Sequence, residues 1–535
     1  MLRSLFIFST LAALQVSDTA RIFAWFPMPS ISHQVVFRPL TQELAKRGHE
    51  VVVMTPDPAF PKGQTPANLT EIDVHDVSYG AWRDIFMSKQ KEMTDDLDVQ
   101  VMMLYTAMMA SLETQLNTTE MKALINGNEQ FDLLLIEGVV LPALAITHVI
   151  KAPVILVNSL GGNPTTLANF GAPIHPFLYP FCIQKRVFNL TIWDKIQQLL
   201  KMGKMASLDR YFYSMTRDAL SRHFGDDLPP LEELEKNVDL LLINENPVWS
   251  EARPLPSNVV YIGGIHKNPK KDLPEDLKAY LDSSKHGVIY MSFGTNVDPS
   301  VLPPEKIQAF IKAFSALPYD VLWKWNEDEL PGRTSNIRIS KWLPQSDLLC
   351  EYHNLANTTR YQQRRKHHPK IKLFITQGGL QSTDEAINAG VPLIGVPVLA
   401  DQWYNVEHYV HHGVGLQLDI KSVNAEIVKN AIETVIGDPS YRQNMLKIRD
   451  LMNDQPMSPL DRAVWWTEHV LRHGGTKHLR SPAWFLTWRQ YYEVDLIVIV
   501  LGSLLLTLVV AIVTVRYLVL FLIRIFTKRV KVKRS

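Results

Sequence analysis

The sequence predicts an α/β protein with two units of alternating parallel strands and helices, followed by one membrane-spanning helix. Three observations lead to this prediction. An apolar run, a helical pattern and a second apolar run follow one another between Ile22 and Met54. A strand-like run from Leu373 to Thr376 is followed by a glycine turn and another helical pattern. Residues 496–515 form an uncharged apolar run of 20 residues, long enough to cross a bilayer.

The N-terminal unit has the pattern of a βαβ motif. Ile22–Phe26 is the first predicted strand, 27–32 a loop, 35–46 a helix and 50–54 the second strand. Such a unit sets its strands in parallel with a right-handed crossover. His33 lies where the first strand passes into the helix, at the sheet edge where ligands bind. A single histidine after a serine at a helix start is more often a capping or surface residue, so the residues alone leave its role open.

The second unit carries the clearest chemical signal. After the strand that ends at Thr376, two glycines let backbone N–H groups approach a phosphate, and the N-terminus of the predicted helix 382–389 favours that anion. Ser382 adds a hydroxyl, and Glu385 is placed to accept the hydroxyls of a ribose. Trp342 offers a stacking face for a base. Asp401 and Gln402 follow a second apolar run and suit sugar hydroxyls. The order and spacing of these groups predict a nucleotide-sugar pocket.

These motifs resemble the signature of the UDP-glycosyltransferases, which move a sugar from a UDP-sugar to small lipophilic molecules. Gln377 together with the sequence 401–405 is closest to the insect members. The likeness extends from Arg21 to the tail. It implies two Rossmann-like domains that face a cleft, the GT-B arrangement, with the acceptor bound by the N-terminal domain. It also implies a reaction without a metal or a cofactor, in which the UDP-sugar is a co-substrate.

The resemblance also assigns roles to residues. The positions that it places on the UDP-sugar are Ser292, Gly294, Thr295, Trp342, Gln345, Gln377, Gly379, Ser382, Glu385, Asp401 and Gln402. It implies that Trp342 stacks on uracil and that Gln345 and Glu385 hold the uridine. Asp401 and Gln402 hold the sugar, and the remaining residues line the diphosphate.

The same resemblance makes His33 the general base that takes the proton from the acceptor hydroxyl, a role that suits a neutral imidazole. A carboxylate usually fixes the tautomer of such a base. The family has an aspartate for this purpose at the end of a later strand, where this chain has Glu137. Glutamate keeps the charge and adds one methylene, which changes the expected geometry by about one bond length.

Two further departures from the family pattern stand out. Gln377 occupies a position where many relatives have histidine, so it donates a hydrogen bond but carries no charge. Between Leu349 and Leu373 the chain has 23 residues, far more than the family needs. The surplus, residues 350–367, is polar and basic. It is either a surface loop, which costs little stability, or a retained intron or gene-model error, which we favour.

Both ends of the chain indicate a compartment. Residues 1–20 have the form of a cleaved secretory signal, and the basic tail after residue 515 is expected in the cytosol. Lys531 and Lys533 resemble a dilysine retrieval signal of the endoplasmic reticulum, although an ordinary basic flank is the alternative. We expect a single-pass type I protein of that membrane with its domains in the lumen. Four sequons are compatible with this: Asn68, Asn117, Asn189 and Asn357.

Length and composition agree with this interpretation. A chain of 535 residues with 46% hydrophobic residues can bury two sizeable domains. A net charge of +1 argues against a nucleic-acid-binding protein. The two cysteines, Cys182 and Cys350, exclude a disulfide framework and a cysteine metal cluster. Histidine and carboxylate metal sites stay open on composition alone, although no HExxH-like spacing occurs among the 17 histidines.

Stretches rich in proline, glycine and charged residues set the predicted domain boundaries. We expect a signal peptide at 1–20, an acceptor-binding domain at 21–260, a linker at 261–285, a UDP-sugar-binding domain at 286–460, terminal helices and a juxtamembrane segment at 461–495, the span at 496–515 and the cytosolic tail at 516–535.

The predicted function is the inverting transfer of a hexose, glucose by the insect resemblance, to a hydroxyl of small lipophilic acceptors. UDP-glucuronate stays open as a donor, and a homo-oligomer stays open as an assembly. Apolar residues at 102–109 and 160–179 are candidates for the acceptor pocket, although such residues are more often core. The alternative is a non-catalytic UDP-sugar-binding membrane protein or an inactive splice form.

Overall fold

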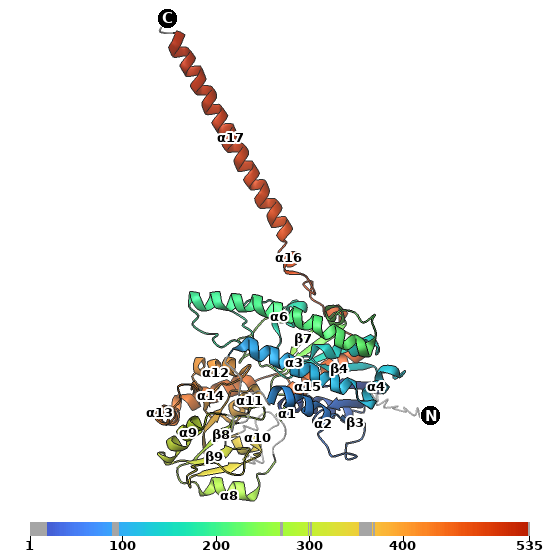
Figure 1. The fold of residues 1–535 in the computed structure, drawn as a ribbon, viewed down its shortest axis with the longest axis vertical. Helices are drawn as coiled ribbons and strands as arrows, with labels where there is room; N and C mark the ends of the chain where they lie inside the picture. Colours follow the sequence, from blue (N-terminus) through green and yellow to red (C-terminus); the bar gives the residue numbers. More distant parts are fainter. Residues whose placement is uncertain are drawn as a thin grey trace, which may run out of the picture.

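The computed structural model describes residues 19–87, 96–267, 271–297, 299, 302–351, 366–367 and 370–532. Two α/β units lie next to each other, and one long helix, α17 (Val494–Val532), stands away from them (Figure 1). The predicted signal peptide lies outside the described residues except for its last two positions. The sequon at Asn357 and the last three residues of the tail also lie outside them.

The N-terminal unit is built on a parallel sheet of seven strands. They are β1 (Arg21–Trp25), β2 (Glu50–Thr55), β3 (Leu69–Asp73), β4 (Leu133–Glu137), β5 (Val154–Asn158), β6 (Val238–Ile243) and β7 (Val259–Tyr261). Their order is β3-β2-β1-β4-β5-β6-β7, so the order reverses between β1 and β4. The crevice beyond the carboxyl ends of two such strands is where open α/β sheets bind ligands.

Helices cover both faces of this sheet, which explains its continuous apolar strands. In β4 every residue is buried, and alternate side chains enter different cores. Leu133 and Leu135 pack under α1 (Ile31–Lys46) and α15 (Pro459–His473). Leu134 and Ile136 pack under the helices of the other face. The remaining helices of this unit are α2 (His75–Trp82), η1 (Arg83–Met87), α3 (Leu97–Leu116), α4 (Thr119–Asn126), η3 (Leu141–His148), α5 (Pro164–Asn169), α6 (Ile192–Phe224) and α7 (Leu231–Glu235).

Helix α1 begins at Ile31, four residues before the predicted start. Ser30 is extended, with φ of −152°, and its carbonyl accepts the N–H groups of His33 at 2.9 Å and Gln34 at 3.2 Å. The predicted loop 27–32 therefore ends at its fourth residue. His33 lies inside the first helical turn, where its side chain is fixed by regular backbone geometry.

The second unit repeats this architecture with six parallel strands in the order β10-β9-β8-β13-β14-β15. They are β8 (Val288–Ser292), β9 (Asp320–Lys324), β10 (Ile337–Ser340), β13 (Ile371–Thr376), β14 (Leu393–Gly395) and β15 (Gly415–Gln417). Here the order reverses between β8 and β13, where Ser292 pairs with Thr376. The serine–glycine turn and the double-glycine turn of the sequence thus leave the sheet beside each other.

In the described part of this unit, seven α-helices accompany the sheet: α8 (Glu275–Ser283), α9 (Pro304–Ser315), α10 (Gln345–Leu349), α11 (Leu380–Ala389), α12 (Gln402–His411), α13 (Ala425–Gly437) and α14 (Pro439–Asn453). Helix α11 ends at Gly390 in the left-handed conformation, with φ of 72°, as its sequence predicts. The helix starts two residues before the predicted position because Gly379 already serves as its N-cap.

The chain passes between the two units twice. After β7 it enters α8, whose Leu277 and Leu281 pack in the core of the second unit, so the predicted linker 261–285 contains a helix of that unit. After α14 the chain returns, and α15 packs Ala463 and Val470 against the core beneath α1. An ion pair of 3.2 Å between Arg47 and Glu468 joins α15 to the N-terminal unit.

The described residues at the two ends of the predicted surplus segment pair with each other. Strand β11 (Cys350–Glu351) pairs in antiparallel fashion with β12 (Lys366–His367). The side chain of Cys350 is buried in the core of the second unit. It therefore belongs to the fold and not to the surplus. Residues 352–365 lie outside the described part of the chain.

Helix α17 is longer than the predicted span. Its stretch Val494–Thr527 is long and apolar enough to cross a membrane by length and composition. The prediction ended the span at Val515 because Arg516 follows it. The next residues, up to Phe526, are again apolar apart from Arg524, so the helical pattern continues. Long basic side chains can reach the lipid headgroups from such positions.

Candidate active site

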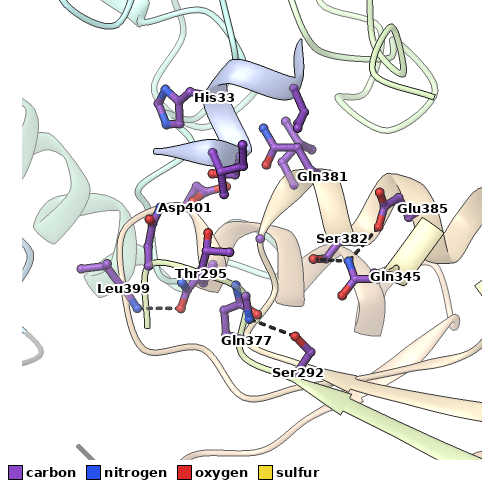
Figure 2. A pocket seen from close by; sticks show the side chains of 18 of the residues that line it. His33, Ser292, Thr295, Gln345, Gln377, Gln381, Ser382, Glu385, Leu399 and Asp401 are labelled. Carbon is purple, nitrogen blue, oxygen red and sulfur yellow. Dashed lines mark hydrogen bonds between the residues drawn. The ribbon is translucent and has the colours of Figure 1, made fainter. Parts of the chain in front are cut away.

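A cavity of about 370 Å³ opens between the carboxyl ends of the two sheets (Figure 2). Residues of both units line it. The eleven residues predicted for the UDP-sugar and His33 all lie along this one cavity. Glu137 is fully buried behind His33 and does not line it.

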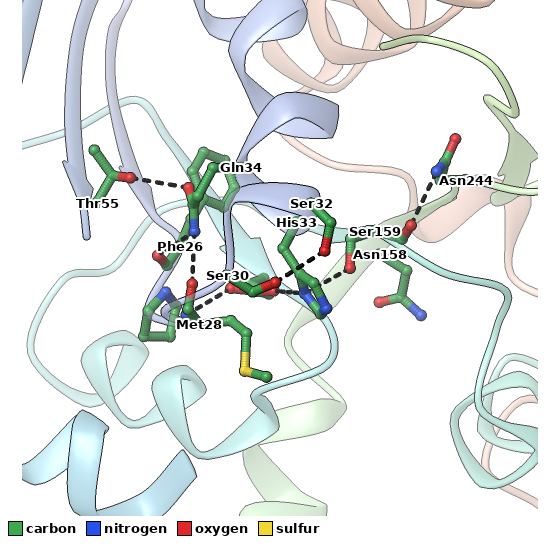
Figure 3. Close-up of polar contacts among 12 residues, drawn as sticks. Phe26, Met28, Ser30, Ser32, His33, Gln34, Thr55, Asn158, Ser159 and Asn244 are labelled. Atoms are coloured by element: carbon green, nitrogen blue, oxygen red, sulfur yellow. Dashed lines mark hydrogen bonds and ion pairs between the residues drawn. The ribbon is translucent and has the colours of Figure 1, made fainter. Parts of the chain in front are cut away.

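The His33 ring is held on its Nδ1 side. Glu137, the last residue of β4, places Oε1 2.7 Å from Nδ1, and Ser159 Oγ lies 2.8 Å from the same nitrogen (Figure 3). The second carboxylate oxygen of Glu137 accepts the N–H of Met28 at 3.0 Å. The longer glutamate therefore reaches the imidazole. With Nδ1–H facing a carboxylate, the lone pair of the neutral ring is on Nε2.

The loop between β1 and α1 is fixed by Gln34. Its Nε2 donates to the carbonyls of Phe26 at 3.1 Å and Met28 at 2.9 Å, and its Oε1 accepts from Thr55 Oγ1 at 2.9 Å (Figure 3). This side chain binds two strands to the start of α1. The position of His33 is thus set by the sheet itself.

The N-terminus of α11 opens into the cavity. Its N-cap is Gly379, and no side chain caps the first turn. The preceding Gly378 has φ of +97°, and a Cβ there would lie 2.6 Å from Val406 Cγ2 and 2.9 Å from the carbonyl oxygen of Gln402. Only glycine fits this turn. The uncapped N–H groups and the helix dipole form a site for an anion.

The amide of Gln377 faces the turn after β8. Its Oε1 accepts a hydrogen bond from Thr376 Oγ1 at 2.9 Å, which directs the NH₂ group away from Thr376. A Cβ on Gly294 would lie 2.4 Å from Gln377 Nε2, and Gly294 has φ of +72°. The absence of a side chain at Gly294 therefore leaves room for an amide donor between the two turns.

Gln345 occupies the far end of the cavity. Its Nε2 donates to Glu385 Oε2 at 2.7 Å and to Ser382 Oγ at 2.9 Å, and its Oε1 accepts from Tyr290 OH at 2.9 Å (Figure 2). Burial raises the pKa of Glu385 to about 7. Trp342 stands at the mouth with 64% of its surface exposed, so its indole face is open to a planar ligand.

Asp401 is the N-cap of α12, at the end of the loop that follows β14, and Gln402 is the first residue of that helix. Gln402 Oε1 accepts the N–H groups of Val398 and Leu399, both at 2.8 Å, so its carbonyl holds the loop in shape. Asp401 Oδ2 accepts from Asn405 Nδ2 at 2.8 Å. Burial raises the pKa of Asp401 to about 6. Asp401 therefore presents a polar group to the cavity, whereas Gln402 offers only its amide nitrogen.

Sequence reasoning missed several polar residues of this site, namely Ser159, Tyr290, Asn296, Lys324 and Gln381. Ser159 follows β5 and Lys324 ends β9, so both stand at the carboxyl ends of strands, where ligands bind. Their place at strand ends was the feature from which the sequence could have predicted these two residues. Gln381 Nε2 donates to the carbonyl of Ser159 at 3.1 Å and joins the two units beside His33.

A second cavity, of about 130 Å³, shares Leu104, Val139, Leu160, Ala400 and Asp401 with the first. Most of its lining is apolar, and its polar residues include Asp209, whose Oδ1 accepts from Tyr105 OH at 2.8 Å. The predicted acceptor regions each contribute to it. Residues 102–109 supply Leu104, Tyr105 and Met108, and residues 160–179 supply only Leu160, Gly161 and Asn163.

The sequence matches the profile of the UDP-glucuronosyl and UDP-glucosyl transferase family over residues 22–532. An ecdysteroid UDP-glucosyltransferase of Spodoptera littoralis nuclear polyhedrosis virus is 34% identical, with 91% of this chain and 95% of that protein covered. UDP-glucosyltransferase 2 of Dactylopius coccus is 32% identical, with 92% of each covered.

Among solved structures, the calicheamicin glycosyltransferase CalG4 is similar in fold, with a TM-score of 0.55 and 17% identity. The match covers 85% of this chain and 99% of CalG4. The predicted GT-B arrangement of two Rossmann-like units is confirmed by this likeness and by the strand orders of the two sheets.

Proposed function

The chain belongs to the UDP-glucuronosyl and UDP-glucosyl transferase family, and from this premise we propose that it transfers glucose to a hydroxyl group of small lipophilic acceptors, with inversion. It is an insect-type UDP-glycosyltransferase, and a UDP-sugar is its donor. UDP-glucose is supported as the donor by the names of the two relatives above, both glucosyltransferases. The apolar second cavity, which shares lining residues with the cavity that His33 lines, supports a lipophilic acceptor.

One observation carries the proposal. The imidazole of His33 is bound through Nδ1 to a buried carboxylate at 2.7 Å and lines the same cavity as the uncapped N-terminus of α11. A base and an anion site are thus brought together from opposite units. This is the pair of groups that a displacement at a sugar carbon requires.

In the proposed reaction, His33 Nε2 takes the proton of the acceptor hydroxyl. The acceptor oxygen forms a bond to the anomeric carbon while the bond from that carbon to the diphosphate oxygen breaks, and UDP leaves with the electron pair. Glu137 stabilises the imidazolium that forms. The N–H groups of α11 and the amide of Gln377 stabilise the charge on the departing diphosphate. No metal is needed for these steps.

The other residues of the cavity position the donor. Trp342 stacks on uracil, and Glu385 accepts the ribose hydroxyls while Gln345 fixes its carboxylate. Asp401 accepts hydroxyls of the glucose. The Oε1 atom of Gln402 holds the loop, so its amide nitrogen is the atom proposed to bind a sugar hydroxyl.

The proposed location is the membrane of the endoplasmic reticulum, with the two units in the lumen and the tail in the cytosol. Helix α17 and the basic residues at its end support this orientation. The described sequons Asn68, Asn117 and Asn189 are all exposed, as glycan acceptors must be. Sensitivity of the expressed protein to endoglycosidase H tests the proposal, and an unmodified chain would contradict it.

The decisive experiment replaces His33 with alanine in the full chain expressed in microsomes. Loss of the base should lower glucose transfer to phenols by about 10²–10⁴-fold, with UDP binding unchanged because the donor contacts lie on the other unit. His286→Ala, an exposed histidine of the second unit, is the matched control. Equal turnover by His33→Ala and the wild type would remove His33 from the mechanism.

If the wild type transferred no detectable glucose, the non-catalytic alternative would be favoured. A form without residues 352–365, whose flanking residues Cys350–Glu351 and Lys366–His367 already pair, separates an inactivating insertion from an untested acceptor. Activity only in the shortened form would identify the segment as the cause.

A further inference from the structure

Helix α6 presents an apolar face to solvent at its N-terminal half. This outer face consists of Ile192, Trp193, Ile196, Leu199 and Leu200, which are 42% to 80% exposed. Their spacing places them along one side of a helix. A contiguous exposed apolar surface of this kind usually marks an interaction site.

The opposite side of α6 belongs to the protein interior. Gln198 and Phe212 are buried, and Met205, Asp209 and Phe212 line the second cavity. The same helix therefore carries the outer face on residues 192–200 and, further along, one wall of the second cavity on residues 205–213. The outer face is not the side of α6 that packs in the core, because other residues of the same helix already make the contacts with the interior.

Basic side chains flank the outer face. Residues 192–205 contain three lysines, Lys195, Lys201 and Lys204, against the single acid Asp194. Lys204 pairs with Asp98 and keeps 58% of its side chain exposed. An exposed apolar stripe bordered by lysines is typical of helices that lie in the interface of a bilayer.

The position of α6 relative to the membrane helix supports the same partner. Figure 1 shows α6 along the side of the body from which α16 (Trp488–Tyr491) and α17 leave. Trp488, Tyr491 and Tyr492, immediately before α17, are 69%, 52% and 57% exposed. Such aromatic residues favour the headgroup region. The membrane that α17 crosses is therefore brought to the side of the body on which α6 lies.

We propose that the outer face of α6 docks on the bilayer that α17 crosses, with its apolar side chains among the acyl chains and its lysines at the headgroups. The N-terminal unit then rests on the membrane at a second point beside its anchor. If the proposed function also holds, the helix that rests on the lipid also lines the second cavity, and lipophilic acceptors reach that cavity along α6 from the bilayer. The docking itself does not depend on that function.

Tryptophan quenching in the full chain tests the docking directly. The protein is reconstituted into vesicles of phosphatidylcholine and phosphatidylserine, with and without bromine on the acyl chains. The emission of Trp193 is obtained as the difference between the wild type and Trp193→Phe. We expect brominated lipid to quench this component about twofold or more. The same difference for Trp465→Phe, an exposed tryptophan of α15, should show no quenching.

A double substitution, Leu199→Gln with Leu200→Gln, should abolish the quenching of Trp193 while α17 keeps the protein in the membrane fraction. Both positions point outward, so folding is expected to persist, and UDP binding checks it. Leu451→Gln, at an exposed leucine of α14, is the matched control. In active protein the double variant should also raise the KM for a vesicle-borne acceptor several-fold and leave the KM for UDP-glucose unchanged.

Two results would overturn the proposal. If brominated lipid did not quench the emission of Trp193 in the wild type, the outer face would not enter the bilayer. A change of oligomeric state in the double variant, with no change in quenching, would assign the outer face to a second copy of the chain. Inactive protein with quenched Trp193 would refute the proposed function and leave the docking intact.

Discussion

Replacing Glu137 with glutamine tests the most specific geometric feature of the site. One carboxylate oxygen faces His33 Nδ1 at 2.7 Å, and the other accepts the N–H of Met28 at 3.0 Å. In the variant, the amide oxygen stays with the Met28 N–H, because the NH₂ group cannot accept a hydrogen bond. The NH₂ group then donates to Nδ1, and the proton of the neutral ring moves to Nε2. The nitrogen that should take the acceptor proton is then already protonated.

The magnitude follows from this change of tautomer. An amide in place of the carboxylate behind a catalytic histidine lowers kcat by about 10⁴-fold, equivalent to about 5 kcal/mol in the activation barrier. Glu137→Asp is the graded comparison, because removal of one methylene opens the 2.7 Å contact to about 4 Å. The loss of a hydrogen bond to a charged group, about 1.5–3 kcal/mol, should lower kcat roughly 10- to 100-fold.

Steady-state kinetics with UDP-glucose and a phenol measure both variants. Glu137 does not line the cavity, so kcat should fall while the affinity for UDP stays that of the wild type. A purely structural defect would instead weaken UDP binding and lower the melting temperature. If Glu137→Gln kept kcat within about twofold of the wild type, far from the effect of a lost orienting carboxylate, the assignment of His33 as the base would be wrong.

Two further predictions concern the donor side. Burial raises the pKa of Glu385 to about 7, and only the ionised carboxylate accepts both ribose hydroxyls, so the Kd of UDP should rise about tenfold from pH 8 to pH 6. Calorimetric titrations should show a smaller pH dependence in Glu385→Gln, and an unchanged one would exclude this contact. Gly378→Ala should weaken UDP binding and cost about 1–3 kcal/mol of stability, because a Cβ meets Val406 and Gln402 there. Gly437→Ala, which meets nothing within 4 Å, should melt like the wild type.

Local chemistry explains which elements the sequence predicted well. Helix α11 was placed within two residues at its start and ended at the right residue, because the double glycine and Gly390 act through their own backbones. The start of α1 was placed too late. Ser30 and Ser32 are both favoured N-cap residue types, so residue type does not decide between them. The N-cap is Ser30, whose carbonyl accepts the first N–H groups without a side-chain cap.

Non-local contacts explain what the sequence left open. Each residue predicted for the donor lies near a strand end within a recognisable motif, and all of them line one cavity. Ser159 and Gln381 meet only because the two units face each other, and no local pattern records that contact. The burial of Cys350 likewise depends on how the chain packs around α10. The residue types of the polar segment that follows give no indication of this packing.

The two passages of the chain between the units restrict how the cleft can open. One lies between β7 and α8 and the other between α14 and α15, where Asn246 Nδ2 also donates to the carbonyl of Met452 at 3.3 Å. Two bodies joined at two separate points cannot twist or slide independently. Rotation about the line through both connections is the motion that displaces the two passages least. Donor entry and UDP release therefore share one coordinate of motion, and a rigid cross-link at any point away from that line should stop both together.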